Sequence, residues 1–444
     1  MKLLQTIQVR RSIRTAFAGL ALAAVPVGAV AVPATAGGDR HPGTIGLVSV
    51  GAGGGGGNAG LFPGYEKNVG MSADGRYVVF SSYSTDLVAD DTNGHRDVFV
   101  RDTWTGRTTL VSVGAGGVQG NQESREGSIS ADGRFVAFSS AASNLLPGDT
   151  NNGPDVFLRD LLTGRTTLVS VGRNGQANQG AHQPEISADG HHVAFTSGST
   201  NLVVGDTNDT GDVFVRDLDA DHTERVSLTA DGRESNHSSG DPAISANGRF
   251  VAFASNLEVA VRDRGTHRTR VVSRGVTVDD RSEFLEAVKP TVSNDGRFVV
   301  FTVIGWQPGM DPVPNVWLRD LGTDRLELIS VDHLGEPAYA IGGSFRADIS
   351  ADGRYVTFGS TARLTRLDEG ELSDVFRLDR KTGSLGWITS GQDQAQVDNR
   401  NGSHGPAISD DGQHVAFDSD ARTLTPGGGT FGYDTYVWSS ARSS

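Results

Sequence analysis

The sequence predicts an all-β fold, a seven-bladed β-propeller whose blades are four-stranded antiparallel sheets, from three observations. One nine-residue phrase recurs seven times, further short runs of β-forming residues follow the copies, and the last copy lacks its final run. A single copy of that final run, without the other runs of a unit, precedes the first phrase. Regular repetition of one small β unit is typical of propellers, in which neighbouring units bury each other's faces.

The recurring phrase defines the blades. Its first copy runs from Ser72 to Phe80 and reads Ser-Ala-Asp-Gly-Arg-Tyr-Val-Val-Phe. Successive copies are separated by 58, 57, 58, 48, 57 and 59 residues. The seven blade motifs start at Ser72, Ser130, Ser187, Ser245, Ser293, Ser350 and Ser409. The predicted propeller domain therefore occupies residues 37–444.

Each unit is predicted to contain four strands, A to D. The runs are rich in β-branched and aromatic residues and are bounded by Gly, Asp or Asn, which is the pattern of strands and turns. In the second unit, strand A ends at Ser130, strand B spans Arg134–Ser139, strand C spans Asp155–Asp160 and strand D spans Thr166–Val171. An Asp-Gly turn joins strands A and B, since both residues tolerate positive φ.

The two ends of the chain are predicted to share the seventh blade. Strand C of the last unit is Thr435–Trp438, and the sequence stops at Ser444 without a strand D. The run Thr44–Val50 matches the strand D of the first unit, Thr108–Val113. A ring left open would expose an unpaired strand edge. We therefore expect the N-terminal strand to close the last blade.

Residues 1–36 are predicted to be a secretory signal peptide. Basic residues precede an apolar stretch from Ala16 to Val32, and a small-x-small cleavage pattern ends at Ala36. Proline and glycine interrupt the stretch, which is shorter than the roughly 20 residues of a spanning helix. We expect a secreted or cell-envelope protein with no membrane span in the mature chain. Arg10 and Arg11 leave open a twin-arginine route.

Composition limits the partners and the chemistry. The formal net charge of −14 repels nucleic acid, so a nucleic-acid partner is not expected. The chain has no cysteine, which excludes disulfides, thiolate zinc sites and cysteine nucleophiles. No motif identifies a catalytic residue, so enzymatic activity is left open and not favoured.

The phrase at Ser130–Phe138 resembles the WD40-like (PD40) repeat of TolB-like β-propellers. The resemblance covers roughly residues 44–440 of the chain. It implies the propeller scaffold. Because that family includes periplasmic interaction modules, peptidase-associated propellers and a pectate-oligomer lyase, the resemblance leaves the ligand open.

Candidate ligand-binding residues lie four and five places before the motif serines. There strand A is expected to enter the central channel, on the face that carries the longer B-to-C and D-to-A loops. Unlike the turn residues, these side chains differ from blade to blade, as a binding site requires. They are Arg125, Glu126, His182, Gln183, Asp241, Lys289, Arg346 and His404. The alternative is that they are solvated loop ends.

A possible calcium site recurs in the B-to-C loops of the first three blades. Carboxylate and amide side chains stand at positions one, three and seven, and such oxygens suit a hard cation. They are Asp91, Asn93 and Asp97, then Asp149, Asn151 and Asp155, then Asp206, Asn208 and Asp212. The alternative is that they form Asx-turns that hold the loop against strand C.

The leading hypothesis is an exported binding module that recognises a protein or glycan through its loop-rich face. One alternative is a polysaccharide-acting enzyme, a lyase or hydrolase, with its site at the channel mouth and with His182 and His404 as acid/base or metal-binding groups. Another is a structural propeller stabilised by calcium. No other cofactor is expected.

Overall fold

The structure is a computed structural model that describes residues 43–59, 69–151, 153–276, 284–306, 312–337, 343–368, 372–390, 402–421, 423–426 and 432–441. The predicted signal peptide lies outside these residues. Within them, no helix has the length and apolar character needed to cross a membrane.

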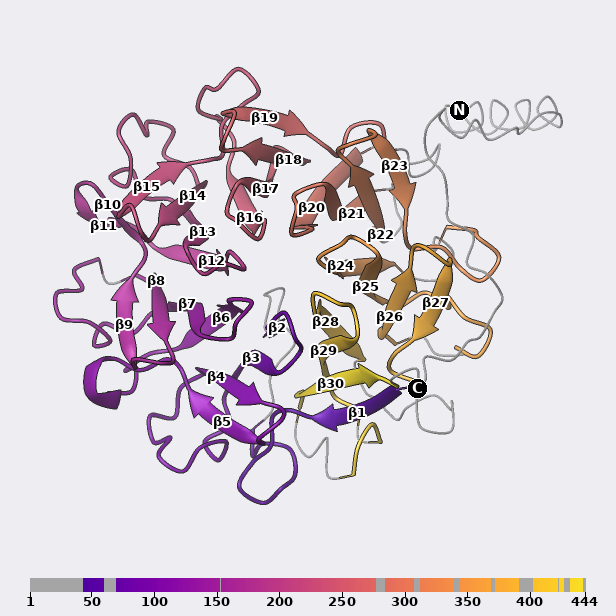
Figure 1. The fold of residues 1–444 in the computed structure, drawn as a ribbon. Helices are drawn as coiled ribbons and strands as arrows, with labels where there is room; N and C mark the ends of the chain where they lie inside the picture. Colours follow the sequence, from indigo (N-terminus) through magenta and orange to yellow (C-terminus); the bar gives the residue numbers. More distant parts are fainter. Residues whose placement is uncertain are drawn as a thin grey trace, which may run out of the picture.

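Seven four-stranded antiparallel sheets surround a central channel (Figure 1), which confirms the predicted fold. Blades 1 to 3 consist of β2 (Val69–Met71), β3 (Tyr77–Ser82), β4 (Asp97–Asp102), β5 (Arg107–Leu110); β6 (Ser124–Ile129), β7 (Phe135–Ser140), β8 (Asp155–Asp160), β9 (Arg165–Leu168); β12 (Ala181–Ile186), β13 (His192–Ser197), β14 (Asp212–Asp217), β15 (His222–Arg225). Blades 4 and 5 consist of β16 (Ser239–Ile244), β17 (Phe250–Ser255), β18 (Glu258–Asp263), β19 (Arg268–Val271); β20 (Phe284–Val292), β21 (Phe298–Trp306), β22 (Val313–Asp320), β23 (Arg325–Leu328).

Blades 6 and 7 complete the ring. They consist of β24 (Ser344–Ile349), β25 (Tyr355–Ser360), β26 (Asp374–Asp379), β27 (Ser384–Trp387); β28 (Ser403–Ile408), β29 (His414–Ser419), β30 (Asp434–Ser440), β1 (Gly43–Leu47). Outside the blades, the described residues add a 3-10 turn, η1 (Ala115–Gly117), and a hairpin of β10 (Val171–Gly172) and β11 (Gly175–Gln176).

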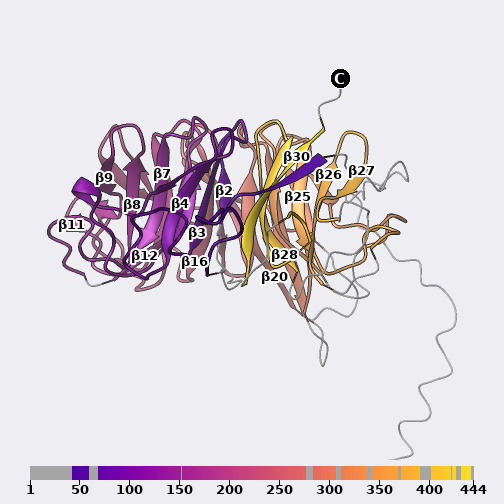
Figure 2. The same ribbon diagram turned by 90° about the horizontal axis from the view of Figure 1, so that it is seen from below.

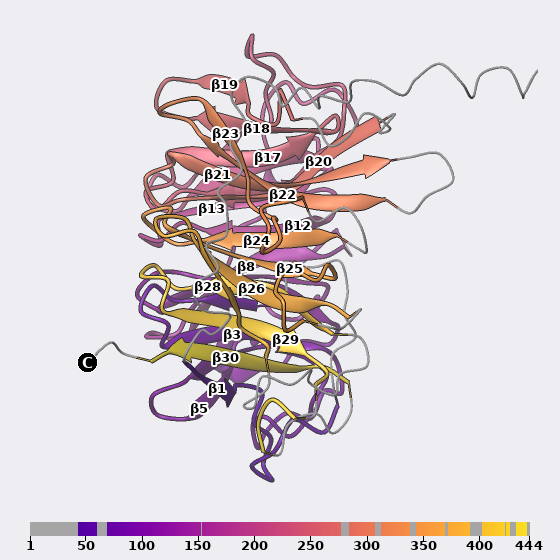
Figure 3. The same ribbon diagram turned by 90° about the vertical axis from the view of Figure 1, so that its right-hand side faces the viewer.

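The N-terminal strand closes the seventh blade, as predicted. β1 pairs antiparallel with β30, with Gly43 opposite Ser440 and Leu47 opposite Tyr436. Figures 2 and 3 show the ring edge-on with these two strands side by side. β1 ends at Leu47, before the predicted Val50, because the N–H groups of Val48 and Ser49 both donate to the Thr435 carbonyl, which breaks the regular pairing. Ser49 Oγ donates to Asp434 Oδ1 at 2.8 Å.

The apolar core lies between the faces of neighbouring blades. In most blades an aromatic ring of strand B stacks on its register partner in strand C, as Phe138 does on Phe157 with 5.7 Å between ring centroids. Val79 and Val98 of blade 1 pack in one cluster with these rings of blade 2. Every blade therefore depends on its neighbours for burial, which is why the ring is continuous.

The residues of the recurring phrase stabilise the A-to-B turns. Ser130 Oγ accepts the N–H of Phe135 at 2.9 Å and donates to Asp132 Oδ1 at 2.6 Å. Arg134 binds Asp160 through two hydrogen bonds and stacks 4.5 Å from the Phe135 ring centroid. Gly190 of the next blade, with φ of 77°, lies against the same ring. These repeated residues stabilise the hairpin turn within each blade, and the glycine of the turn packs on the neighbouring blade.

A closed ring of backbone hydrogen bonds joins all seven blades on the A-to-B turn face. One N–H···O=C bond of 3.0–3.2 Å links each pair of neighbouring blades just after the motif serine. The bonds run from Ala73 to Ala131, Ala131 to Ala188, Asp189 to Ala246, Ala246 to Asn294, Asn294 to Ala351, Ala351 to Asp410 and Asp410 to Ala73. The amide of Asn294 also donates to Asp410 Oδ2 at 2.9 Å, which joins blades 5 and 7 across this ring.

Candidate functional site

A cavity of about 590 Å³ lies where the innermost strands enter the channel from the loop-rich face. Seven of the eight predicted ligand-binding residues line it, and they are Arg125, Glu126, His182, Gln183, Asp241, Lys289 and Arg346. His404 is not among the lining residues. Seven residues that were selected by their position in the repeat, on blades 2 to 6, therefore line one cavity in the structure.

A β-bulge directs one residue of the innermost strand toward this cavity in blades 2 to 7. In blades 2 to 7 the pairing between strands A and B shifts register at this place. The residue four places before the motif serine has a positive φ: Glu126 57°, Gln183 53°, Asp241 50°, Lys289 51°, Arg346 51° and Gly405 59°. Bulges re-aim side chains in this way. For the five L-residues the left-handed conformation costs about 1–2 kcal/mol each.

Proline follows the bulge in four blades. Pro184, Pro242, Pro290 and Pro406 each stand one residue after the left-handed position, and all four line the cavity. Proline has no N–H, so within sheets it is confined to edge strands and bulges, and the innermost strand of a blade is an edge strand. The prolines therefore give the cavity an apolar wall next to its polar ring.

Hydrogen bonds connect the ring of bulged residues from blade to blade. Glu126 Oε2 accepts the backbone N–H of Gln183 at 2.8 Å, and Gln183 Oε1 accepts that of Asp241 at 3.1 Å. Asp241 Oδ1 accepts the Gln183 amide at 2.7 Å and the Lys289 ammonium at 2.6 Å. The bulged residues are therefore acidic on blades 2 and 4 and basic on blades 5 and 6, while Arg125 on blade 2 and Asp348 on blade 6 also line the cavity.

His404 belongs to an aromatic cluster beside the cavity. Its Nε2 lies 3.2 Å from the Tyr433 hydroxyl, and its ring stacks on Phe345 with 6.1 Å between centroids. Burial raises the pKa of Tyr433 well above its ordinary value, so this hydroxyl is neutral. His182 stands on blade 3 and His404 on blade 7, three blades apart around a ring of seven (Figure 1). Of the two histidines, His182 lines the cavity and His404 lies beside it, and their joint role as acid/base or metal-binding groups stays a prediction.

Two acidic residues of the cavity escaped the sequence reasoning. Glu185 and Asp348 stand two places before their motif serines and line the cavity. Each reaches a neighbouring blade, because Glu185 Oε2 accepts the Ser128 hydroxyl at 3.0 Å and Asp348 Oδ2 accepts the Ile408 N–H at 3.0 Å. The sequence does distinguish these two residues, because the other blades have small or apolar side chains two places before the motif serine.

The predicted calcium residues hold the B-to-C loops against strand C. Asp97 is fully buried, and its Oδ1 accepts the hydroxyl of Ser112 at 2.5 Å. Asn93 forms an Asx-turn with the N–H of His95 at 2.9 Å and donates to Asp97 Oδ2 at 2.7 Å. Burial raises the pKa of Asp97 to about 6. In blade 5 the side-chain oxygen of Asn315 accepts the hydrogen bond of the Ser330 hydroxyl at 2.9 Å. A neutral side chain can therefore make the hydrogen bond that Asp97 makes with Ser112 at the start of strand C.

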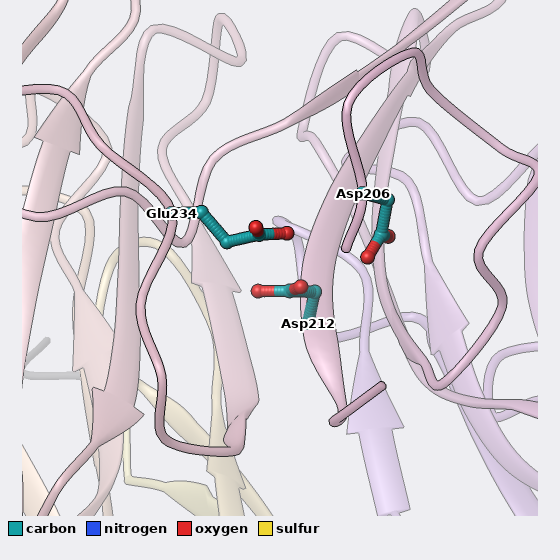
Figure 4. A group of neighbouring side chains, drawn as sticks. All are labelled: Asp206, Asp212 and Glu234. Carbon is teal, nitrogen blue, oxygen red and sulfur yellow. The ribbon is translucent and has the colours of Figure 1, made fainter. Parts of the chain in front are cut away.

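Blade 3 carries three carboxylates at the same place (Figure 4). Ligand atoms of Asp206, Asp212 and Glu234 lie within 4.8 Å of one another. The guanidinium of Arg225 lies among them, with Nη1 3.4 Å from Asp206 Oδ1 and 3.3 Å from Asp212 Oδ2, and it also pairs with Glu234. Arg225 and Glu234 were missed from sequence, although Arg225 stands where Leu110 and Leu168 stand in the preceding blades.

Fold and site together define a closed seven-bladed propeller with a polar cavity at one channel mouth. Neither a family model nor a curated protein matches the chain. Among solved structures it is similar to TolB from Acinetobacter baumannii, at 15% identity over 83% of this chain and 81% of that one, with a TM-score of 0.39.

Two further solved structures are similar at the same level. A putative TolB from Agrobacterium tumefaciens has 17% identity over 59% of this chain and 79% of its own, with a TM-score of 0.36. The β-propeller domain of the Trilobed protease from Pyrococcus furiosus has 13% identity over 84% and 95%, with a TM-score of 0.47. The chain is thus similar to TolB and other β-propellers, as the repeat phrase indicated, and the likeness concerns the fold.

Proposed function

We propose that this chain is an exported binding module that recognises a protein or glycan at the channel mouth on its loop-rich face. The observation that supports this proposal is the ring of five polar L-residues in the left-handed conformation around the cavity. The proposed export is supported by the features of residues 1–36. Secretion or retention in the cell envelope follows from it.

The strain in the ring is the reason to assign it a function. Gly405 occupies the same position in blade 7, so the blade fold accepts glycine there. Glycine adopts positive φ without the steric cost that Glu126 or Arg346 bears. Residues kept in strained conformations gather at binding and catalytic sites. Polar side chains at these five positions are therefore expected to serve a ligand at some cost in stability.

The charges of the bulged residues limit the chemistry of the ligand. Lys289 and Arg346 on blades 5 and 6 suit carboxylate or sulfate groups, whereas Glu126 and Asp241 suit ammonium or hydroxyl groups. A peptide segment and a charged or hydroxyl-rich sugar both offer such groups. The apolar proline wall adds the nonpolar contact that small-ligand sites commonly combine with a few polar groups.

Arrays of peptides and glycans, followed by calorimetry on the strongest ligand, test the proposal. We expect Arg346→Gly to weaken binding of that ligand at least tenfold without lowering the midpoint of denaturant unfolding. His267→Gly is the matched control, because His267 also has a positive φ, 56°, but lies in a turn outside the cavity. Unchanged affinity in Arg346→Gly, or no ligand on either array, would contradict the proposal.

A further inference from the structure

In each of blades 1 to 3, two carboxylates of the B-to-C loop face the same buried space. We define the strand-C slot as the space between the first loop aspartate, Asp91 in blade 1, and the aspartate six residues later that begins strand C, Asp97. Asp91 is 7% exposed and Asp97 is fully buried. Two carboxylates in one buried slot require a compensating donor or cation.

In blade 3 a cation of the chain itself fills the strand-C slot. Arg225 Nη1 lies between Asp206 and Asp212, and its Nη2 donates to the Gly205 carbonyl at 3.2 Å. Glu234 adds a third carboxylate to the guanidinium. The slot therefore has the charge and the space that accommodate a positive group.

In blade 2 a neutral donor fills the slot. The Nε2 of Gln176 donates to Asp149 Oδ1 at 2.8 Å and to Asp155 Oδ2 at 2.6 Å. Both carboxylates thereby receive a hydrogen bond. Blade 2 has no need of a further group at this place.

In blade 1 the equivalent glutamine does not reach the carboxylates. Gln119 Nε2 donates to the Asp90 carbonyl, and its Oε1 accepts the Thr92 N–H at 3.1 Å. The Oδ1 of Asp91 is buried and has no hydrogen-bond partner among the described residues. In blades 2 and 3 this same oxygen points into the slot, toward Gln176 or Arg225. A buried carboxylate oxygen without a partner is rare and costly.

We propose that the strand-C slot of blade 1 binds a hard divalent cation, Ca²⁺, through the carboxylates of Asp91 and Asp97. The carbonyls of Asp90 and Gly120 border the slot and now accept the amide groups of Gln119 and Asn93. The Gln119 amide can turn its oxygen toward a cation at the loss of the hydrogen bond from the Thr92 N–H, because the two ends of an amide have the same shape. Oxygen ligands of this kind in a loop are the preferred surroundings of Ca²⁺. Blade 3 has its own cation, and blade 2 has its own donor.

Calorimetric titration of Ca²⁺ into the chelator-treated whole chain tests the stoichiometry. We expect Asp91→Asn to bind one Ca²⁺ fewer than the natural chain. Asp206→Asn, the equivalent change in blade 3, is the matched control and keeps the stoichiometry of the natural chain. If Asp91→Asn does not fold, Asp97→Asn replaces it, because Asn315 fills the equivalent position in blade 5.

Thermal unfolding gives an independent measurement. Saturating Ca²⁺ is expected to raise the unfolding temperature of the natural chain and of Asp206→Asn by a few degrees, with no rise in Asp91→Asn. Arg225→Leu removes the internal cation of blade 3 and should add a second Ca²⁺ site. The proposal is overturned if Ca²⁺ gives neither heat nor a shift in the natural chain, or if Asp91→Asn binds Ca²⁺ with unchanged stoichiometry.

Discussion

Replacing Gly190 with alanine tests how tightly adjacent blades pack at the A-to-B turns. An added Cβ would lie 2.8 Å from Cδ2 and 3.4 Å from Cε2 of Phe135, where carbon atoms normally approach to about 3.5–4.0 Å. The positive φ of Gly190 adds strain of about 1–2 kcal/mol, and overpacking adds about 1–3 kcal/mol. We therefore expect Gly190→Ala to lower the free energy of unfolding by about 2–5 kcal/mol.

Gly164→Ala separates the two contributions. Gly164 has a similar φ of 70°, but a Cβ there meets only Arg159 Nη2 at 3.6 Å, an ordinary contact. Its cost is therefore the backbone strain alone, about 1–2 kcal/mol. Guanidinium unfolding followed by fluorescence and circular dichroism measures both variants. Equal losses in Gly190→Ala and Gly164→Ala would refute the argument that Phe135 packs on the turn.

Two further predictions concern a buried carboxylate and the closure of the ring. Burial raises the pKa of Asp374 from 3.8 to about 7, so the folded chain binds this proton more tightly than the unfolded chain. The free energy of unfolding should fall as the pH rises from about 4 to about 7, and Asp374→Asn should make the fall smaller; a steeper fall would contradict this assignment. Ser49→Ala leaves Asp434 Oδ1 and the Thr435 N–H without their partner, so we expect a loss of about 1–3 kcal/mol in urea unfolding. The reasoning on closure fails if Ser49→Ala unfolds at the same urea concentration as the natural chain.

The blade count, the strand order and the closure could be predicted from sequence, because each blade repeats the same local chemistry. Ser130, Asp132 and Arg134 act within one turn and its neighbouring strand, so their spacing alone defines the hairpin. The pairing of Gly43–Leu47 with β30 could be predicted by counting strands. The last unit lacks its fourth strand, and one extra strand of the same sequence type precedes the first unit.

The geometry of the site was only partly predictable. Position in the repeat placed Gln183 and Arg346 at the channel mouth, but their left-handed conformation depends on the pairing of strands A and B. The proline that follows this position in four blades was a usable signal for the bulge, whereas Arg346 is followed by alanine. Arg225 was missed because its ion pairs join it to Asp206, Asp212 and Glu234, which stand on separate segments of the blade and share no sequence phrase with it.

The shared seventh blade has a consequence for how the chain reaches its native state. Ser49 and Asp434 are separated by 385 residues, yet their hydrogen bond lies in one sheet. Ile45 and Leu47 pack against the cluster that contains Tyr436 and Trp438, so the first strand finds its apolar contacts only after the last strand has been synthesised. Contacts between such distant residues form late in folding. A prematurely terminated chain therefore retains an open sheet edge and exposed apolar residues, the features by which unfinished products aggregate or are degraded.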